Sequence, residues 1–71
     1  MNVVFKFSVY LKDGKSRITY RVIRTEDDDF IIQEYGSGMK MWFNSFENNV
    51  KFHSMHELFR SRFFRCLFVS Y

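Results

Sequence analysis

Apolar and polar residues alternate over the first part of the chain, which is the period-two pattern of a strand with one buried face. One face of this strand carries Val3, Phe5, Phe7, Val9 and Leu11. The other face carries Lys6, Ser8, Tyr10 and Lys12. We therefore predict a half-buried strand whose first set of side chains packs against a core.

The residues that follow predict a hairpin. Asp13-Gly14 is typical of a two-residue turn in which both residues have positive φ, and residues 17–24 alternate again as a return strand. Closing the chain at this turn gives pairs that are apolar on one face and polar on the other. The apolar pairs are Val9 with Ile18, Phe7 with Tyr20 and Phe5 with Val22; the polar pairs are Tyr10 with Arg17, Ser8 with Thr19, Lys6 with Arg21 and Lys12 with Lys15. A one-residue slip would mix both faces, so the pattern predicts this register.

A second hairpin is predicted within residues 30–44. We expect strands at residues 30–35 and 39–44, joined by a turn at Gly36-Ser37-Gly38. A simple three-residue closure would produce the pairs Ile32 with Trp42, Ile31 with Phe43, and Glu34 with Lys40. Both faces of this hairpin would then carry apolar groups. We therefore expect it either to be covered on both sides or to lie in a protein interface.

A helix is predicted after a candidate short strand at residues 50–53. Ser54 and Glu57 have the spacing of a capping box, in which the Ser side chain caps a free amide and the Glu reaches back to Ser54. Residues at helical spacing follow, and we expect the helix to run to about residue 65. These residues are Met55, Leu58, Phe59, Arg62, Phe63 and Cys66. Residues 66–71 either continue the helix or form an extended piece.

Strands followed by one late helix favour an α+β fold. We expect a small antiparallel sheet of four to five strands, in two hairpins, with one C-terminal α-helix packed on it. The 71 residues are predicted to form a single domain, 1–71. A chain of this length buries only about 60% of the surface that its unfolded form exposes. Ten Phe, four Tyr and one Trp supply a rich core for it.

The cysteine content and the first residues predict the compartment. A single cysteine, Cys66, cannot form an internal disulfide, which favours a reducing environment. The alternating pattern of the first ten residues is not that of a signal or transit peptide. No run approaches the roughly 18 apolar residues of a membrane span. These features together predict a cytoplasmic protein.

Catalytic and metal-binding patterns are weak. His53, His56 and Cys66 are three candidate metal ligands, whereas structural zinc uses four, commonly in two close pairs. They also match no local signature of a nucleophile with its base. Gly36-Ser37-Gly38 lacks the Lys and the strand-to-helix context of a phosphate loop. We expect no enzymatic activity, no metal and no cofactor, with His56 facing solvent and Cys66 buried.

One binding hypothesis concerns nucleic acid. The chain carries a net charge of +3, and the polar face of the first hairpin is basic. Its candidate contacts are Lys6, Tyr10, Lys12, Lys15, Arg17 and Arg21. Positive groups neutralise phosphates, and an exposed Tyr stacks on unpaired bases. The competing interpretation is a solvated outer face that resists aggregation.

The other binding hypothesis concerns a protein partner. The acidic run of residues 26–29 is either a solvated loop or a negative patch. The apolar residues of the C-terminal segment exceed what one sheet face covers, so this segment either meets a partner, forms a homodimer, lies as a basic amphipathic helix on a membrane surface or folds back over the sheet. The candidate contacts are Glu26, Asp27, Asp28, Asp29, Arg60, Phe64 and Phe68.

The junction formed by Val50, Phe52, Ser54 and Glu57, a strand followed by a capped helix, resembles the ending of many small accessory proteins encoded by bacteriophages. This resemblance covers about a quarter of the chain and implies no role for any individual residue. It implies a protein that covers a surface of a host enzyme or defence complex. Our leading expectation is therefore a non-enzymatic protein that modulates a protein partner, with nucleic-acid binding and a homodimeric module as alternatives.

Overall fold

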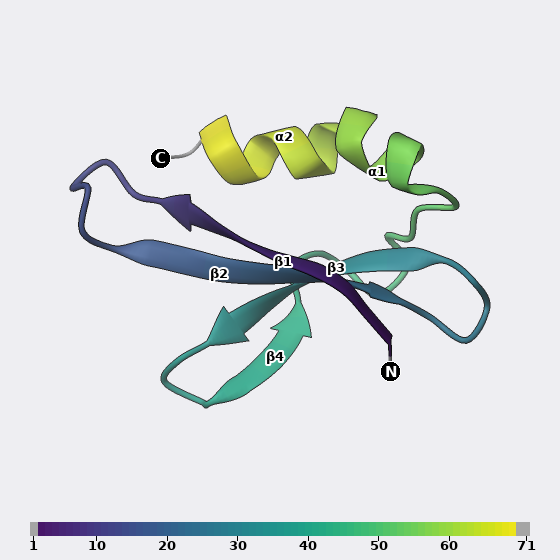
Figure 1. Ribbon diagram of the computed structural model, residues 1–71, viewed down its shortest axis with the longest axis horizontal. Coiled ribbons are helices and arrows are strands. Elements are labelled where there is room, and N and C mark those ends of the chain that lie inside the picture. Colours follow the sequence, from purple (N-terminus) through teal and green to yellow (C-terminus); the bar gives the residue numbers. More distant parts are fainter. Residues whose placement is uncertain (1, 70–71) are drawn as a thin grey trace.

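The computed structural model describes residues 2–69, which form four strands followed by two helices. The strands are β1 (Asn2–Tyr10), β2 (Arg17–Arg24), β3 (Phe30–Gly36) and β4 (Met41–Asn44), and the helices are α1 (Met55–Arg60) and α2 (Arg62–Val69). The strands form one antiparallel sheet in the order β1-β2-β3-β4. Both helices lie across one face of this sheet (Figure 1). The predicted α+β class is confirmed.

The predicted register of the first hairpin is confirmed at every strand pair from Phe5–Val22 to Tyr10–Arg17. A bulge between Val3 and Phe5 then shifts the pairing by one residue, so that Val3 lies opposite Ile23. The bulge therefore moves Val3 away from the face that Phe5 occupies.

The turn of the first hairpin differs from the predicted one. Leu11 N donates to Ser16 O at 2.9 Å, which closes a four-residue loop that contains Lys12 and Lys15. Only Gly14 has positive φ, at 72°. Asp13 Oδ1 accepts from the backbone N–H groups of residues 15 and 16, at 2.8 Å each. These bonds and one from the Ser16 side chain lower the pKa of Asp13, with the side-chain bond contributing most. The longer loop keeps the predicted register, but Lys12 and Lys15 do not form a strand pair.

The predicted register of the second hairpin is wrong. Trp42 lies opposite Tyr35, and Phe43 lies opposite Glu34. Gly36 belongs to β3, and the turn comprises residues 37–40, with Lys40 at a positive φ of 54°. A Cβ on Gly36 would lie 2.8 Å from the Phe43 ring. The glycine therefore serves the close approach of an aromatic ring, and the turn is made further along the chain.

The predicted short strand at residues 50–53 is reduced to one bridge between Phe30 and Phe52, with N–O distances of 2.7 and 2.9 Å. The predicted cap at Ser54 is confirmed, since its Oγ accepts from Glu57 N at 3.1 Å. Glu57 reaches back one residue further than predicted, because its Oε2 accepts from His53 N at 3.0 Å.

The single predicted helix is divided at Ser61, which has extended backbone angles. Its Oγ donates to Leu58 O at 2.7 Å and accepts from Phe64 N at 3.1 Å, so one side chain ends α1 and starts α2. Residues 66–69 continue the helix rather than forming an extended piece, since α2 ends at Val69. Ser70 and Tyr71 lie outside the described residues.

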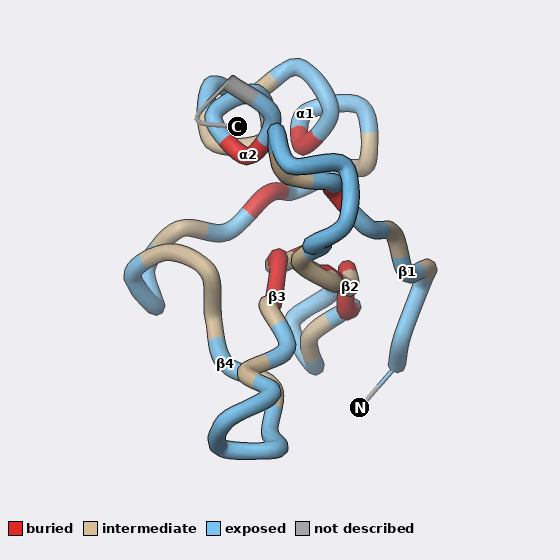
Figure 2. The backbone as a smooth tube through the Cα atoms, turned by 90° about the vertical axis from the view of Figure 1, so that its left-hand side faces the viewer, coloured by how far each residue is buried: buried red, intermediate tan, exposed pale blue. Residues whose placement is uncertain are grey.

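The core lies between the helices and the sheet (Figure 2). Its buried residues are Val9, Tyr20, Val22, Phe30, Ile32, Phe52, Leu58 and Leu67. The ring of Phe7 connects the layers, because its centroid lies 5.3 Å from that of Tyr20 and 5.6 Å from that of Phe64. The β3–β4 hairpin extends away from the helices and carries no residue of this core in β4 (Figure 2).

Candidate functional site

The face of the sheet that points away from the helices is called the open face here. Side chains alternate along each strand, so the residues next to core positions point to this face. Its polar and aromatic members are Lys6, Ser8, Tyr10, Arg17, Thr19, Arg21, Gln33, Tyr35, Trp42 and Asn44. The register aligns one row straight across all four strands, namely Lys6, Arg21, Gln33 and Asn44.

Three aromatic rings lie on the open face. Tyr10 is 61% exposed, and Tyr35 is also exposed. The rings of Tyr35 and Trp42 meet edge to face, with centroids 5.1 Å apart. The guanidinium of Arg21 lies over the Trp42 ring, 4.4 Å from its centroid. Sequence reasoning found only Tyr10 here, because the predicted register turned Trp42 toward the other face. A four-residue turn after Gly36 would have placed Trp42 opposite Tyr35, and the pairing of β2 with β3 then puts both rings on the face of Arg21.

A chain of side-chain hydrogen bonds supports the centre of the open face. Arg21 Nε donates to Gln33 Oε1 at 2.8 Å, and Gln33 Nε2 donates to Asn44 Oδ1 at 3.1 Å. Asn44 Nδ2 donates in turn to Asn48 Oδ1 at 2.6 Å. Gln33 is buried although it is polar. Both the oxygen and the nitrogen of its side-chain amide have hydrogen-bond partners. This chain of hydrogen bonds holds the Arg21 guanidinium over the indole ring.

The charge on the open face has one sign. Lys6, Arg17 and Arg21 point to it, and none of the strand side chains on this face is acidic. The structure thus brings Lys6, Tyr10, Arg17 and Arg21 together as predicted. Lys12 and Lys15 lie in the loop beyond the strand ends, where Asp13 adds a negative charge.

The C-terminal segment folds back on the sheet, which was one of its predicted alternatives. Leu67 is buried, and the partly buried Phe64 packs against Phe7 and Phe59. Phe68 is 46% exposed, with its ring centroid 6.3 Å from that of Phe7. Phe64 therefore belongs mainly to the fold, and Phe68 keeps an exposed edge.

The prediction that Cys66 is buried is wrong. Its thiol lies on the exposed side of α2 and donates to Phe63 O at 3.0 Å. The predicted exposure of His56 is confirmed.

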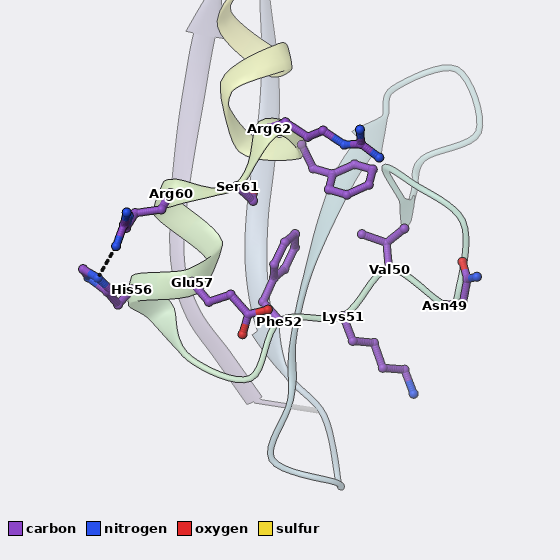
Figure 3. A pocket seen from close by; sticks show the side chains of 10 residues that line it. Asn49, Val50, Lys51, Phe52, His56, Glu57, Arg60, Ser61 and Arg62 are labelled. Carbon is purple, nitrogen blue, oxygen red and sulfur yellow. Dashed lines mark hydrogen bonds between the residues drawn. The ribbon is translucent and has the colours of Figure 1, made fainter.

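A groove of about 770 Å³ runs along the junction of α1 and α2, opposite residues 49–52 (Figure 3). Phe52, Phe63 and Val50 supply apolar lining. Arg60 lies on one side, 3.5 Å from the imidazole Nε2 of His56. Arg62 and Lys51 lie on the other side, and the Arg62 guanidinium lies over the Phe63 ring. Only Arg60 of this groove was predicted as a contact.

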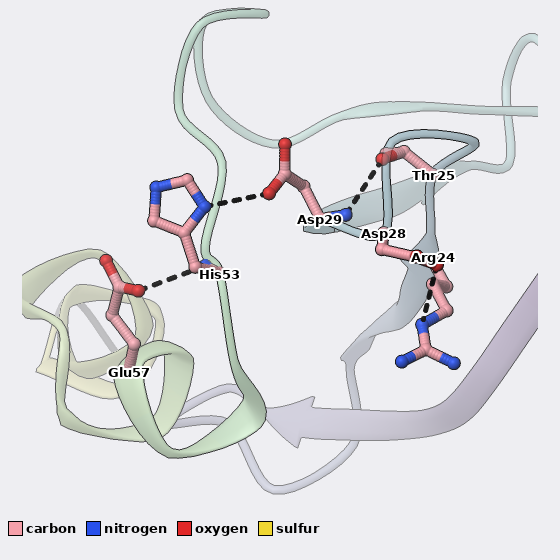
Figure 4. A network of polar contacts seen from close by, with 6 residues as sticks. All are labelled: Arg24, Thr25, Asp28, Asp29, His53 and Glu57. Atoms are coloured by element: carbon pink, nitrogen blue, oxygen red, sulfur yellow. Dashed lines mark hydrogen bonds and ion pairs between the residues drawn. The ribbon is translucent and has the colours of Figure 1, made fainter.

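The acidic run forms a structured turn rather than a free patch (Figure 4). Asp28 Oδ1 lies 3.6 Å from Arg24 Nε, and Asp29 Oδ1 lies 2.8 Å from His53 Nδ1. Asp29 N also donates to Thr25 Oγ1 at 3.1 Å. Two of the four predicted acidic contacts are therefore used within the molecule. Glu26 and Asp27 are exposed.

The contact between Asp29 and His53 joins the β2–β3 turn to the start of α1. The hydrogen bond to Asp29, followed by the charges of Asp29 and Glu57, raises the pKa of His53 above 6.5. This turn lies at the end of the molecule where α1 begins, whereas α2 ends at the opposite end (Figure 1). The acidic run and Phe68 therefore do not form one continuous contact surface.

Comparison with protein-family models, curated proteins and solved structures finds no match for this chain. Within residues 2–69, no three His, Cys, Asp or Glu side chains gather in a way that could hold a metal ion. No helix in the described part of the chain is long and apolar enough to cross a membrane. The most distinctive chemistry in this chain is the basic and aromatic open face.

Proposed function

We propose that the protein binds single-stranded nucleic acid on the open face. The observation that carries this proposal is the presence of three aromatic rings and three cationic side chains on the sheet face that points away from the helices. The aromatic members are Tyr10, Tyr35 and Trp42, and the cationic members are Lys6, Arg17 and Arg21.

The aromatic rings favour unpaired bases over a duplex. Bases of a single strand stack on exposed rings and gain about 1–3 kcal/mol each, whereas bases in a duplex already stack on one another. Tyr10 lies at one side of the face, and the Tyr35–Trp42 pair lies at the other. The open face therefore offers two separate stacking positions, one on β1 beside Arg17 and one on β3 and β4 beside Arg21.

The cations supply the attraction for the sugar–phosphate backbone. Lys6 and Arg21 are direct cross-strand neighbours, and like charges in such positions destabilise a sheet. Binding an anionic chain would remove this repulsion. For a single strand, three phosphate contacts predict a slope of about −2 for the logarithm of the affinity against the logarithm of the salt concentration.

The test is fluorescence anisotropy with labelled oligonucleotides of about ten nucleotides, a length within the usual range for such sites. Single-stranded DNA, single-stranded RNA and a duplex of the same sequence are titrated separately over a range of salt concentrations. We expect binding to one or both single strands, weaker binding to the duplex, and the salt slope given above.

A double charge reversal locates the site. Lys6→Glu with Arg17→Glu should weaken binding tenfold or more and flatten the salt slope. The matched control is Lys51→Glu with Arg65→Glu, which changes the net charge equally at exposed positions away from the open face. Salt-independent binding, or loss of binding in the control alone, would contradict the assignment to the open face.

A second candidate function is the modulation of a protein partner, as in our leading expectation from the sequence. The groove at the α1–α2 junction supports it, because three cations line it and only one acid, Glu57. An apolar lining with this charge balance suits an acidic peptide with an apolar anchor; the cations are Lys51, Arg60 and Arg62. A stable complex of this kind gains most from an anchor that fills a pocket. The expected partner is therefore a negatively charged segment of another protein.

This second candidate is tested by capture from a lysate treated with nuclease. A partner that binds the wild type should be lost when Arg60→Glu and Arg62→Glu are combined, and it should be retained by Arg65→Glu, whose side chain does not line the groove. Equal capture by all three proteins would rule the groove out as the binding surface.

A further inference from the structure

The two edges of the sheet differ in how they are protected. An edge strand presents unpaired main-chain groups, and proteins commonly block such an edge with a charge or a bulge. β1 has both, namely Lys6 and the bulge after Val3. β4 has neither, because its sequence from Met41 to Asn44 contains no charged residue and its register with β3 is regular.

The main chain of β4 is directed toward a further strand. Ser45 N donates to Ile32 O at 3.0 Å, so this pair is hydrogen-bonded across β3 and β4. Hydrogen-bonded and non-bonded pairs alternate in an antiparallel ladder. The N–H and C=O groups of Trp42 and Asn44 therefore point away from β3, to the free edge.

Apolar side chains flank this edge. Met39 is 66% exposed and Met41 is 52% exposed, and the ring of Phe43 is also accessible. The β3–β4 hairpin extends from the body of the molecule, so the helices do not shield it (Figure 2). An unprotected edge with exposed apolar neighbours on a projecting hairpin has the properties of a docking surface.

We infer that β4 pairs antiparallel with β4 of a second copy of this chain. A two-fold axis at Trp42 places the two Trp42 residues opposite each other, with their outward main-chain groups bonded to one another. The same axis places Met41 of each copy opposite Phe43 of the other, so apolar groups meet on one face. A surface that matches itself in this way is the requirement for a symmetric dimer.

The charges of β4 and its turn are compatible with this pairing. The nearest charged residue is Lys40, just before the strand. The two-fold axis places the two Lys40 side chains at opposite ends of the paired strands, each near Asn44 of the other copy. Like charges therefore do not meet.

A stable dimer requires a larger contact area than the paired strands alone provide. Standard interfaces bury about 1,200–2,000 Å² in total, which is more than four paired residues provide. Within the strands, Met41 and Phe43 contribute apolar surface, and the adjacent turn adds the exposed side chain of Met39. The dimer would also join two open faces into one eight-stranded surface, a consequence that rests on the proposed function.

The association is measured by sedimentation of the full chain without nucleic acid, over a wide range of concentrations. We expect the mass to rise from that of the 8.7 kDa monomer toward twice this value. Met41→Lys should raise the dissociation constant by roughly tenfold or more, because it places a charge in the apolar contact. Val4→Lys is the matched control and should leave the dissociation constant unchanged, because Val4 is also an exposed apolar residue but lies in β1, at the opposite edge of the sheet.

Cross-linking tests the register. Met41→Cys and Phe43→Cys are prepared separately, each with Cys66→Ser, and then mixed under oxidising conditions. Positions 41 and 43 of different copies would form a non-hydrogen-bonded pair with Cα atoms about 4.5 Å apart, which a disulfide can span. We expect the mixed disulfide, and little cross-linking of either variant alone.

Three outcomes would overturn the inference: a monomer mass at every concentration, a dimer that Met41→Lys leaves intact, and a dimer without the mixed disulfide. A monomer would point instead to an extended segment of another protein as the occupant of the edge. None of these outcomes affects nucleic-acid binding by a single copy, which is measured separately.

Discussion

The two faces of the sheet use aromatic residues in different ways. On the covered face, Phe5 and Phe7 of β1 pack against Phe59, Phe64 and Phe68 of the helices. On the open face, the aromatic residues are Tyr10, Tyr35 and Trp42, interleaved with cations. Phenylalanine has no polar atom to satisfy, whereas Tyr and Trp combine an apolar ring with a hydrogen-bonding group that suits a surface.

The kind of aromatic residue, and not only its spacing, therefore distinguishes the core from the candidate binding surface. Tyr20 is the exception, because it lies fully buried on the covered face and stacks on Phe7. Its neighbours in β2, Val22 and Ile18, also pack on the covered side. The covered face should therefore determine stability, and the open face should determine binding.

The largest effect is expected from Leu58→Ala on the covered side. Leu58 is 0% exposed at the centre of the core, and removing such a side chain costs about 2–5 kcal/mol. A domain of this size has a free energy of unfolding of roughly 5 kcal/mol. We expect a strongly destabilised variant that keeps between about 0 and 3 kcal/mol of this free energy of unfolding, as measured by urea denaturation followed by circular dichroism.

Leu11→Ala is the control for this prediction, because it makes the same substitution at a half-buried position beside the hairpin loop. It should cost clearly less. Equal costs at the two positions would mean that the core does not lie where the helices meet the sheet.

A smaller effect is expected when either of two aromatic rings on β1 is removed. Phe7 and Tyr10 lie three residues apart in β1 and point to opposite faces. Phe7→Ala should lower the free energy of unfolding, whereas Tyr10→Ala should leave it nearly unchanged. Tyr10→Ala should instead weaken binding to a single strand by about 1–3 kcal/mol, or roughly five- to 150-fold.

Both variants are measured by urea denaturation and by anisotropy with the same oligonucleotide. Tyr10→Phe keeps the ring and removes the hydroxyl, so it should preserve most of the binding. If Tyr10→Ala unfolds the domain, or binds as tightly as the wild type, the separation between the two faces is lost.

The sequence predicted the first hairpin well because each strand pair had to match on both faces. It predicted the second hairpin poorly, because both faces of β3 and β4 carry apolar groups and several registers satisfy the pattern. Gly36 lies in β3 against the Phe43 ring, so the turn begins after it, at residue 37. The helix break at Ser61 was missed because the apolar spacing continues through it, and only the two hydrogen bonds of its side chain reveal it.

The candidate site was predicted only in part, because the register of the first hairpin was predicted correctly and that of the second was not. Lys6, Tyr10, Arg17 and Arg21 depend on the first hairpin, so their shared face followed from its register. Trp42 depends on the register of the second hairpin, and Tyr35 depends on the pairing of β2 with β3, so both were missed. The internal partners of the acidic run join segments far apart in sequence, such as Asp29 with His53, and no local pattern indicates such a contact.

The smallest effect concerns this last contact and its dependence on pH. The pKa of His53 is raised above 6.5 in the folded chain, chiefly by the hydrogen bond to Asp29 and next by the charge of Asp29. Its contribution to stability is therefore fully present below 6.5 and is lost as the pH rises through the folded pKa. We expect the melting temperature to fall slightly as the pH rises above about 6.5, the ordinary pKa of histidine.

Three variants isolate this contact from the rest of the molecule. His53→Gln and Asp29→Asn should each remove the pH-dependent part of the melting temperature, because each removes one of the two charges. His56→Gln should keep it, since His56 lies on the exposed side of α1 and contacts Arg60 instead. A pH dependence that persists in His53→Gln would mean that another group is responsible, and that the β2–β3 turn is not joined to α1 by this ion pair.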